Sequence, residues 1–176
     1  QKALAEAEGR VLIGPRSGSR DRHFAIPQGL PPGPLAALAG TRVTQVASLR
    51  PGLSQGVTGA VSGAVARWRD HAEAVEAEVL ARFDDGGPAL TRKGRVHALM
   101  GWPEEGLLGQ VAAHMAGVAG LQTLALPPQI RLRRRGDWWF FFNYGPGEWS
   151  LPEGFDLLLG SATVPPQGLT IAQSRT

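Results

Sequence analysis

The chain has 176 residues, of which 43% are hydrophobic and 19% are charged, and its formal net charge at pH 7 is +3. This composition is near the globular average, which excludes global disorder, and the small positive charge does not require a nucleic-acid partner. The absence of cysteine excludes disulfide bonds, thiolate zinc sites and cysteine nucleophiles, and no apolar stretch approaches the roughly 18–20 residues of a membrane helix.

The beginning of the chain predicts part of an α/β unit. Residues 1–8 have the pattern of the last turns of a helix, and Val11–Ile13 is a short, wholly apolar run typical of a buried parallel strand. Because a helix that leads into a parallel strand is half of a repeating unit, we expect the preceding strand to lie outside this sequence. The first residue is Gln1 and not Met, so we expect a fragment or a processed chain.

Residues 14–34 are rich in glycine, proline and arginine and predict a long loop. A loop of this length in a compact domain is usually functional or forms an arm at an interface. The sequence then predicts a short helix over Leu35–Leu38, an alternating strand over Arg42–Leu49 and a flexible surface loop over Gly52–Gly63.

The middle of the chain predicts a meander of four strands followed by one helix. The strands are expected near Val65–Trp68, Val79–Phe83, Ala89–Thr91 and Arg95–Met100. The helix is expected over Glu104–Val118, with an apolar face formed by Leu107, Leu108, Val111, Met115 and Val118.

Pro127-Pro128 predicts a domain boundary, because only short strands and turns follow it. The strands are expected over Gln129–Arg135, Trp138–Tyr144, Phe155–Leu159 and Leu169–Ala172. Regularly spaced short strands predict a small antiparallel β-sandwich. We therefore expect two domains, 1–124 and 125–176.

The sequence contains no complete active site or metal site. Ser17 follows Gly14-Pro15-Arg16, which departs from the G-x-S-x-G spacing of hydrolase nucleophiles. No histidine stands at a metal-ligand spacing from another, and only His23, in the long loop beside Arg20, is placed where it could face a ligand. No carboxylate pair suits a glycosidase and no phosphate-binding loop is present, so we expect no catalytic residue, metal or cofactor in this chain.

A run of arginines and aromatic residues allows three interpretations. Arg131 and Arg133–Arg135 precede Trp138–Phe142, and such a combination can bind nucleic acid. Because the aromatic residues are consecutive on one strand, both of its faces are apolar, and we favour a core strand with the arginines on its hairpin partner. A carbohydrate-binding platform formed by Trp138, Trp139 and Trp149 is the alternative.

Several segments of the chain together resemble the carboxyl-terminal half of bacterial family 42 β-galactosidases. The resemblance is carried by GRVLIGPRSGSRDRHFAIPQGLPPGPL at Gly9–Leu35, TRVTQVASLRPG at Thr41–Gly52, EVLARFDDGGPALTRKGRVHALMGWP at Glu78–Pro103 and RRRGDWWFFFNYGPGEWSLP at Arg133–Pro152. It implies a fold in which a partial flavodoxin-like domain, similar to class I glutamine amidotransferases and responsible for trimer formation, occupies residues 1–124. A small terminal β domain then occupies residues 125–176.

The same resemblance implies a non-catalytic chain. In this family a TIM barrel carries both catalytic glutamates, and this chain has no counterpart of the barrel. A galactoside substrate would therefore be bound by the barrel of the parent enzyme and not by this chain alone. The resemblance also implies self-association as a trimer. The absence of cysteine and of a leader segment favours the cytoplasm, and the charge and hydropathy lead us to expect no nucleic acid or membrane as partner. A bare sheet edge beside Val11–Ile13 would favour such association. Arg16, Ser17, Arg20 and His23, in the long loop, are the candidates for a ligand site or an interface, because this loop is expected to reach a neighbour's sugar pocket.

Overall fold

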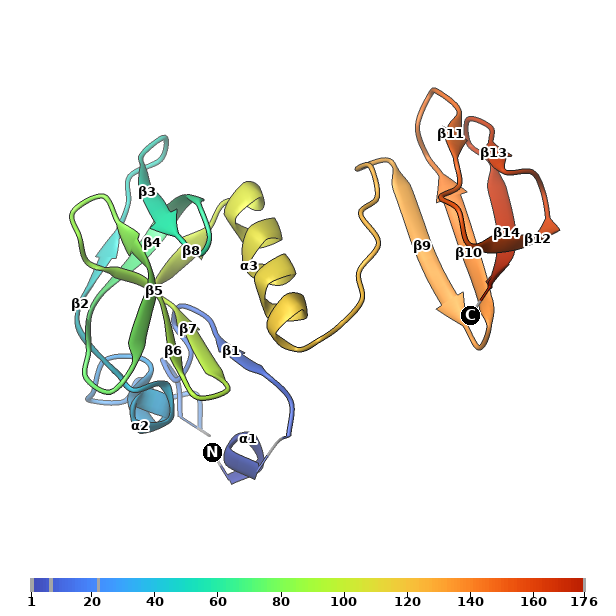
Figure 1. Ribbon diagram of the computed structural model, residues 1–176. Coiled ribbons are helices and arrows are strands. Elements are labelled where there is room, and N and C mark those ends of the chain that lie inside the picture. Colours follow the sequence, from blue (N-terminus) through green and yellow to red (C-terminus); the bar gives the residue numbers. More distant parts are fainter. Residues whose placement is uncertain (1, 7, 22, 176) are drawn as a thin grey trace. The chain divides into compact units, whose positions relative to one another are not determined.

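The computed structural model describes residues 2–6, 8–21 and 23–175 (Figure 1). Gln1, Ala7, Arg22 and Thr176 lie outside the described residues. The chain divides into two compact units, which we call unit 1 (Gln1–Thr123) and unit 2 (Leu124–Thr176). Among the described residues, no helix has both the length and the hydropathy needed to cross a bilayer.

Unit 1 consists mostly of strands. Its elements are α1 (Lys2–Glu6), β1 (Val11–Ile13), the 3-10 helix η1 (Gly33–Leu35), α2 (Ala36–Ala39), β2 (Thr41–Ser48), β3 (Ser54–Gly59), β4 (Gly63–Ala74), β5 (Glu78–Phe83), β6 (Pro88–Lys93), β7 (Val96–Leu99), β8 (Gly101–Pro103) and α3 (Glu105–Val118). The strands predicted in the meander are present, and so are the helix before Gly40 and the helix that follows Glu104.

In the described part of unit 1, eight strands form one sheet with the order β1-β7-β6-β5-β3-β4-β2, and β8 pairs with β4. β1 runs parallel to β7, as expected for Val11–Ile13, whereas the other pairs are antiparallel. β7 continues through Met100 into β8, and the pairings β8-β4, β4-β3, β3-β5, β5-β6 and β6-β7 lead back to this same continuous segment. These six strands therefore form a closed ring, whereas β1 and β2 lie outside it, each with one strand partner among the described residues.

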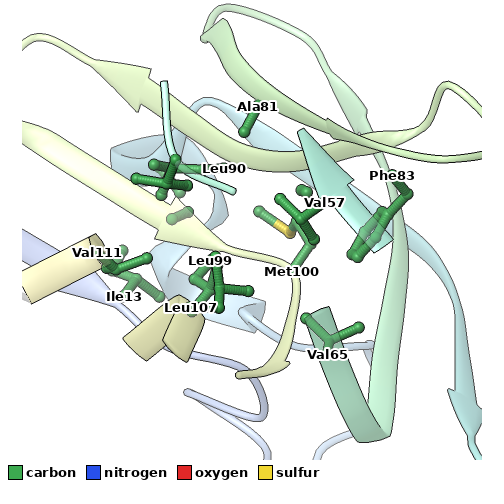
Figure 2. Close-up of a cluster of buried hydrophobic side chains, with 14 of the residues drawn as sticks. Ile13, Val57, Val65, Ala81, Phe83, Leu90, Leu99, Met100, Leu107 and Val111 are labelled. Carbon is green, nitrogen blue, oxygen red and sulfur yellow. The ribbon is translucent and has the colours of Figure 1, made fainter. Parts of the chain in front are cut away.

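The buried hydrophobic side chains of unit 1 form one cluster, part of which is shown in Figure 2. Its side chains come from almost every element of unit 1 and include Ile13, Val57, Val65, Phe83, Leu90, Leu99 and Met100. α3 packs against β4 and β8 and contributes Leu107 and Val111. Leu108, expected on the same apolar face of α3, is instead exposed, since the buried face of this helix is narrower than its apolar pattern suggests.

The prediction of a flexible loop over Gly52–Gly63 is wrong, because β3 lies there and pairs with both β4 and β5. The glycines allow neighbouring chain segments to approach closely. A Cβ atom at Gly59, whose φ is 140°, would lie 2.5 Å from the carbonyl oxygen of Leu80, and one at Gly56 would lie 2.5 Å from Asp84 Oδ2. The glycine content therefore reflects tight packing in a sheet and not flexibility.

Unit 2 consists of β9 (Ile130–Arg135), β10 (Trp138–Asn143), β11 (Trp149–Ser150), β12 (Phe155–Leu159), β13 (Thr163–Val164) and β14 (Leu169–Ser174). Its described residues form a four-stranded sheet, ordered β12-β14-β10-β9, and a two-stranded ribbon of β11 and β13. β9 and β10 pair as a hairpin, which confirms that the arginine run is the partner of the aromatic strand.

The aromatic strand β10 is not buried on both faces as predicted. Phe141 is fully buried against Trp149 and Phe155, whereas Trp138 is 54% exposed and the remaining aromatic residues are partly buried. The reason is that Trp149 of the short ribbon packs on the face of β10 that carries Phe141, whereas Trp138 points to the opposite face. The described residues are 44% strand and 14% helix, so they are mostly β, and among them the parallel arrangement is limited to β1 and β7.

Candidate functional site

The predicted site residues all lie in the long loop between β1 and η1 of unit 1. We call its described residues, 14–21 and 23–32, the arm. Local backbone hydrogen bonds shape its first part, from Ser17 N to the Gly14 oxygen at 3.3 Å and from Ser19 N to the Arg16 oxygen at 3.0 Å. The arm therefore has a defined path and is not a flexible linker.

Arg16 anchors the base of the arm through an aromatic side chain of β4. Its guanidinium carbon lies 4.8 Å from the ring centroid of Trp68, and its φ is 64°. The Trp68 indole Nε1 donates to Asp70 Oδ1 at 2.7 Å. These contacts join the arm to a buried carboxyl group through a cation–π contact and a hydrogen bond.

Asp70 is buried, and its surroundings do not fully compensate its charge. Burial raises the pKa of this carboxyl, against the smaller lowering effects of the Trp68 hydrogen bond and of the charges of His71 and Arg16. Asp70 and Ser17 line a hollow of about 10 Å³, which is near the smallest volume that holds one water molecule. No histidine lines this hollow, so Ser17 has no adjacent base there.

Arg16 and Arg20 contribute to a second, more open depression, which we call the arm groove. Its volume is about 220 Å³, and it is lined by Arg16, Ser19, Arg20, Ile26, Pro27, Gln28, Gly29, Leu30, Pro31, Val46 and Trp68. Such a surface combines guanidinium groups with an indole and several apolar side chains. It is suited to an acidic or amphipathic partner.

His23 lies apart from the other three predicted residues, in a turn of the arm, and lines neither depression. The structure thus brings Arg16 together with Ser17 at the small hollow and with Arg20 at the arm groove. Trp68 and Asp70, which sequence reasoning missed, connect these places. The predicted strand ends at Trp68, so Asp70 falls outside it; β4 in fact continues to Ala74, and the spacing of two residues puts both side chains on one face of this strand.

Other polar groups of unit 1 have structural roles. Arg69 is buried, donates to Gln55 Oε1 at 2.7 Å and to Asp85 Oδ1 at 2.8 Å, and lies 4.2 Å from the Phe83 ring centroid. The hydrogen bond from Arg69, followed by that from the Gly87 N–H, lowers the pKa of Asp85. Asp85 therefore ties the turn after β5 to β4.

The histidines of the core pack against each other. The ring of fully buried His97 meets that of His114 edge to face, with 5.3 Å between the centroids. Burial, followed by the charges of His114, Arg92 and Arg10, lowers the pKa of His97, and the polar backbone of Arg95 opposes this effect. Throughout the described residues, no group of three or more His, Asp or Glu side chains is arranged to hold a metal ion.

The tryptophans of unit 2 do not form the platform considered above. Trp138 is exposed, but Trp139 lies beside it in sequence and so points to the opposite face of β10, where it contacts Phe155 and Arg134. Trp149 packs against Phe141 in the interior. An open hollow of about 610 Å³ in unit 2, between Leu151 and Arg175, is not lined by any of the three tryptophans.

A family model and two curated relatives match this chain. The family model of the β-galactosidase trimerisation domain matches residues 1–122. The chain is 47% identical over 173 residues to a β-galactosidase of Thermus thermophilus, covering 97% of this chain and 27% of that protein, and 48% identical to β-galactosidase BgaA of a Thermus species with the same coverage. It spans about a quarter of the length of these curated relatives.

Solved structures extend the similarity to the whole chain. The β-galactosidase of Marinomonas ef1 matches with a TM-score of 0.91 at 32% identity, over 98% of this chain and 26% of that one. The β-galactosidase of Halorubrum lacusprofundi matches with a TM-score of 0.88 at 27% identity, over 99% of this chain and 28% of that one. Both units are therefore included in the similarity.

Proposed function

Because the chain belongs to the β-galactosidase trimerisation-domain family, we propose that it is the assembly-forming, non-catalytic part of a family 42 β-galactosidase. The match of residues 1–122 to this family is the observation that carries the proposal. The parent enzyme would remove terminal β-galactosyl groups, and the TIM barrel that does so has no counterpart in this chain. The identity to Thermus β-galactosidases over about a quarter of their length supports this division of labour.

The acidic residues of the chain support a non-catalytic role. Glycoside hydrolysis uses two carboxyl groups on either side of the scissile bond, separated by about 5–9 Å. Here four acidic side chains of the two units are engaged in ion pairs: Glu73 with Arg42, Glu78 with Arg92, Glu76 with Lys93 and Asp156 with Arg175. Asp70, on β4, is buried and accepts a hydrogen bond from the Trp68 indole. Asp85 is likewise paired, with Arg69.

We further propose that residues 1–124 are the later part of an amidotransferase-like oligomerisation domain and that residues 125–176 are a small terminal β-sandwich domain. The parallel strand β1 supports the first assignment, because it lies at the end of the strand order with β7 as its one partner among the described residues. An open edge of this kind is available for another strand. The absence of cysteine fits a cytoplasmic location, which we also propose.

The arm is our candidate for the contact with a neighbouring copy. Arg16, Arg20 and His23 would approach that neighbour's galactoside pocket, and Ser17 would help to hold the base of the arm. The stacking of Arg16 on Trp68 and the shared groove of Arg16 and Arg20 support this role, since they give a long surface segment a fixed path.

Light scattering coupled to size-exclusion chromatography tests the assembly. We expect a mass three times that of the 18.6 kDa chain, decreasing on dilution. A chain that stays monomeric at high micromolar concentration would contradict the assembly role. Hydrolysis of a chromogenic β-galactoside by the purified chain, unchanged after removal of contaminating enzyme, would contradict the non-catalytic role.

A further inference from the structure

We propose that Phe24 is the hydrophobic anchor by which the arm binds a second copy of this chain. The proposal rests on the assembly role above and specifies which part of the arm makes the contact. It derives from three observations: how the turn that carries Phe24 is built, how exposed its side chain is, and what a threefold assembly requires.

The turn around Phe24 is held by hydrogen bonds and is closed at its base. Asp21 Oδ1 accepts from His23 N at 2.8 Å and from Ala25 N at 2.9 Å. The Asp21 carbonyl accepts from Phe24 N at 3.1 Å, and Asp21 N donates to the Ala25 oxygen at 3.0 Å. Four hydrogen bonds to one aspartate therefore organise the turn before any partner binds, which lowers the entropy that binding must remove.

This organised turn presents a large apolar side chain to solvent. Phe24 is 84% exposed and Ile26, two residues later, is 74% exposed. Phe24 also has φ 60°, a left-handed conformation that costs a bulky residue free energy. In an isolated chain, an exposed aromatic ring on a strained backbone does not add to the stability of unit 1. Aromatic side chains of this kind are, however, frequent anchors at interfaces.

A second copy of the chain is the partner that these observations favour. A closed threefold ring is built from head-to-tail contacts, in which a projecting element of one subunit meets a different surface on the next. The arm exposes Phe24 and Ile26 to solvent, and residues 1–122, which contain it, match a trimerisation domain. Arg20, which precedes Asp21 in the sequence, lines the arm groove together with Ile26 and would form part of the polar rim around the buried ring.

The replacement Phe24→Gly removes the ring that is proposed to contact the second copy and should leave the fold of unit 1 intact. Glycine adopts the φ of this position without strain, so unit 1 should melt at the same temperature or slightly higher. Loss of the ring should weaken self-association by about tenfold or more, because burying a phenylalanine contributes about 1.5–3 kcal/mol and 1.4 kcal/mol corresponds to tenfold. Sedimentation velocity of the 176-residue chain over a dilution series measures the change.

The matched control is Leu53→Ala, which shortens another exposed apolar side chain, in the turn between β2 and β3. This variant should associate as the unaltered chain does. An unaltered chain that trimerises, together with a Phe24→Gly chain that trimerises equally well, would overturn the anchor and leave the assembly role standing. A monomeric unaltered chain would instead refute the assembly role and the anchor with it.

Photo-cross-linking gives an independent readout. With benzoylphenylalanine in place of Phe24, irradiation should yield covalent dimers of the chain on a denaturing gel. Cross-linking confined to single chains would show that the ring packs within its own molecule, for example on unit 2, and would exclude the second copy as its partner.

Discussion

Unit 1 and unit 2 both bury polar side chains, but they satisfy these side chains by different means. In unit 1 the side chain of Arg69 is 3% exposed and is held by Gln55, Asp85 and the Phe83 ring. In unit 2 the buried amide of Asn143 donates to the carbonyl oxygens of Gly147, Val164 and Pro165, at 2.7, 3.1 and 3.1 Å, and accepts from Gly145 N at 2.9 Å.

This difference has consequences for stability. A buried guanidinium depends on its anionic partner, because its desolvation is not compensated when that partner is lost. A neutral amide that bonds to backbone groups carries no charge to be compensated, and its contribution depends on the geometry of its hydrogen bonds. We therefore expect unit 1 to respond to changes of charge and pH, and unit 2 to respond mainly to loss of the amide.

The largest effect should come from Asp85→Asn, which removes the anionic partner of Arg69. We expect unit 1 to lose about 2–3 kcal/mol of unfolding free energy, because the guanidinium stays buried without a counter-charge, while the half-exposed position of Asp85 lets water compensate part of the loss. Hydrogen exchange of peptides from residues 41–103, compared with peptides from 130–174, localises the loss to unit 1. Glu73→Gln is the control: its ion pair with Arg42 is exposed, so the loss should stay below about 1 kcal/mol.

Asn143→Ala should have a somewhat smaller effect, confined to unit 2. The substitution leaves several buried backbone groups without a partner, and we expect a loss of about 2 kcal/mol. Increased exchange should then appear in residues 130–174 alone. Gln173→Ala, on an exposed position of β14, should change stability by less than about 0.5 kcal/mol. Equal effects of the two substitutions would show that Asn143 does not hold the ribbon to the larger sheet.

The smallest effect concerns pH. The pKa of His97 is lowered in the folded chain, so between that value and the unfolded value of 6.5 the unfolded state binds more protons. Unit 1 should therefore lose stability as the pH falls below 6.5. Unit 2 contains no histidine and serves as an internal control. Urea denaturation at a series of pH values, followed by hydrogen exchange in each unit, measures how the unfolding free energy changes with pH. The variant His97→Leu should show a smaller change in unit 1. An equal change in the variant would show that other groups cause it.

Much of the local structure could be predicted from the sequence. The apolar run Val11–Ile13, the alternating segment before Leu49 and the amphipathic segment after Glu104 each correspond to an element of the predicted type. The segment Gly52–Gly63 could not be recognised as containing a strand, because glycines that allow close packing and glycines that allow flexibility look alike without the neighbouring strands. The narrow buried face of α3 could not be predicted either, because the apolar pattern of a helix does not show how much of its surface the sheet covers.

The candidate site was only partly predictable. The loop and its residues Arg16 and Arg20 stood out by composition and length, but their partner Trp68 belongs to a strand distant in sequence. The exposed ring of Phe24 gave no sequence signal, because an aromatic residue in a loop is as often buried as exposed. Which side chains share a depression depends on how the loop returns over the sheet.

By itself, then, the sequence determined the type and order of most elements, the absence of cysteine chemistry and the resemblance to family 42 β-galactosidases, which the comparisons confirm. These properties depend on each residue and its near neighbours. Tertiary structure alone decided that the sheet of unit 1 closes through Met100, that Arg69 is buried beside Asp85 and that the turn of Asp21 exposes Phe24. Such outcomes depend on contacts between distant segments, and no local pattern records the free energy of those contacts.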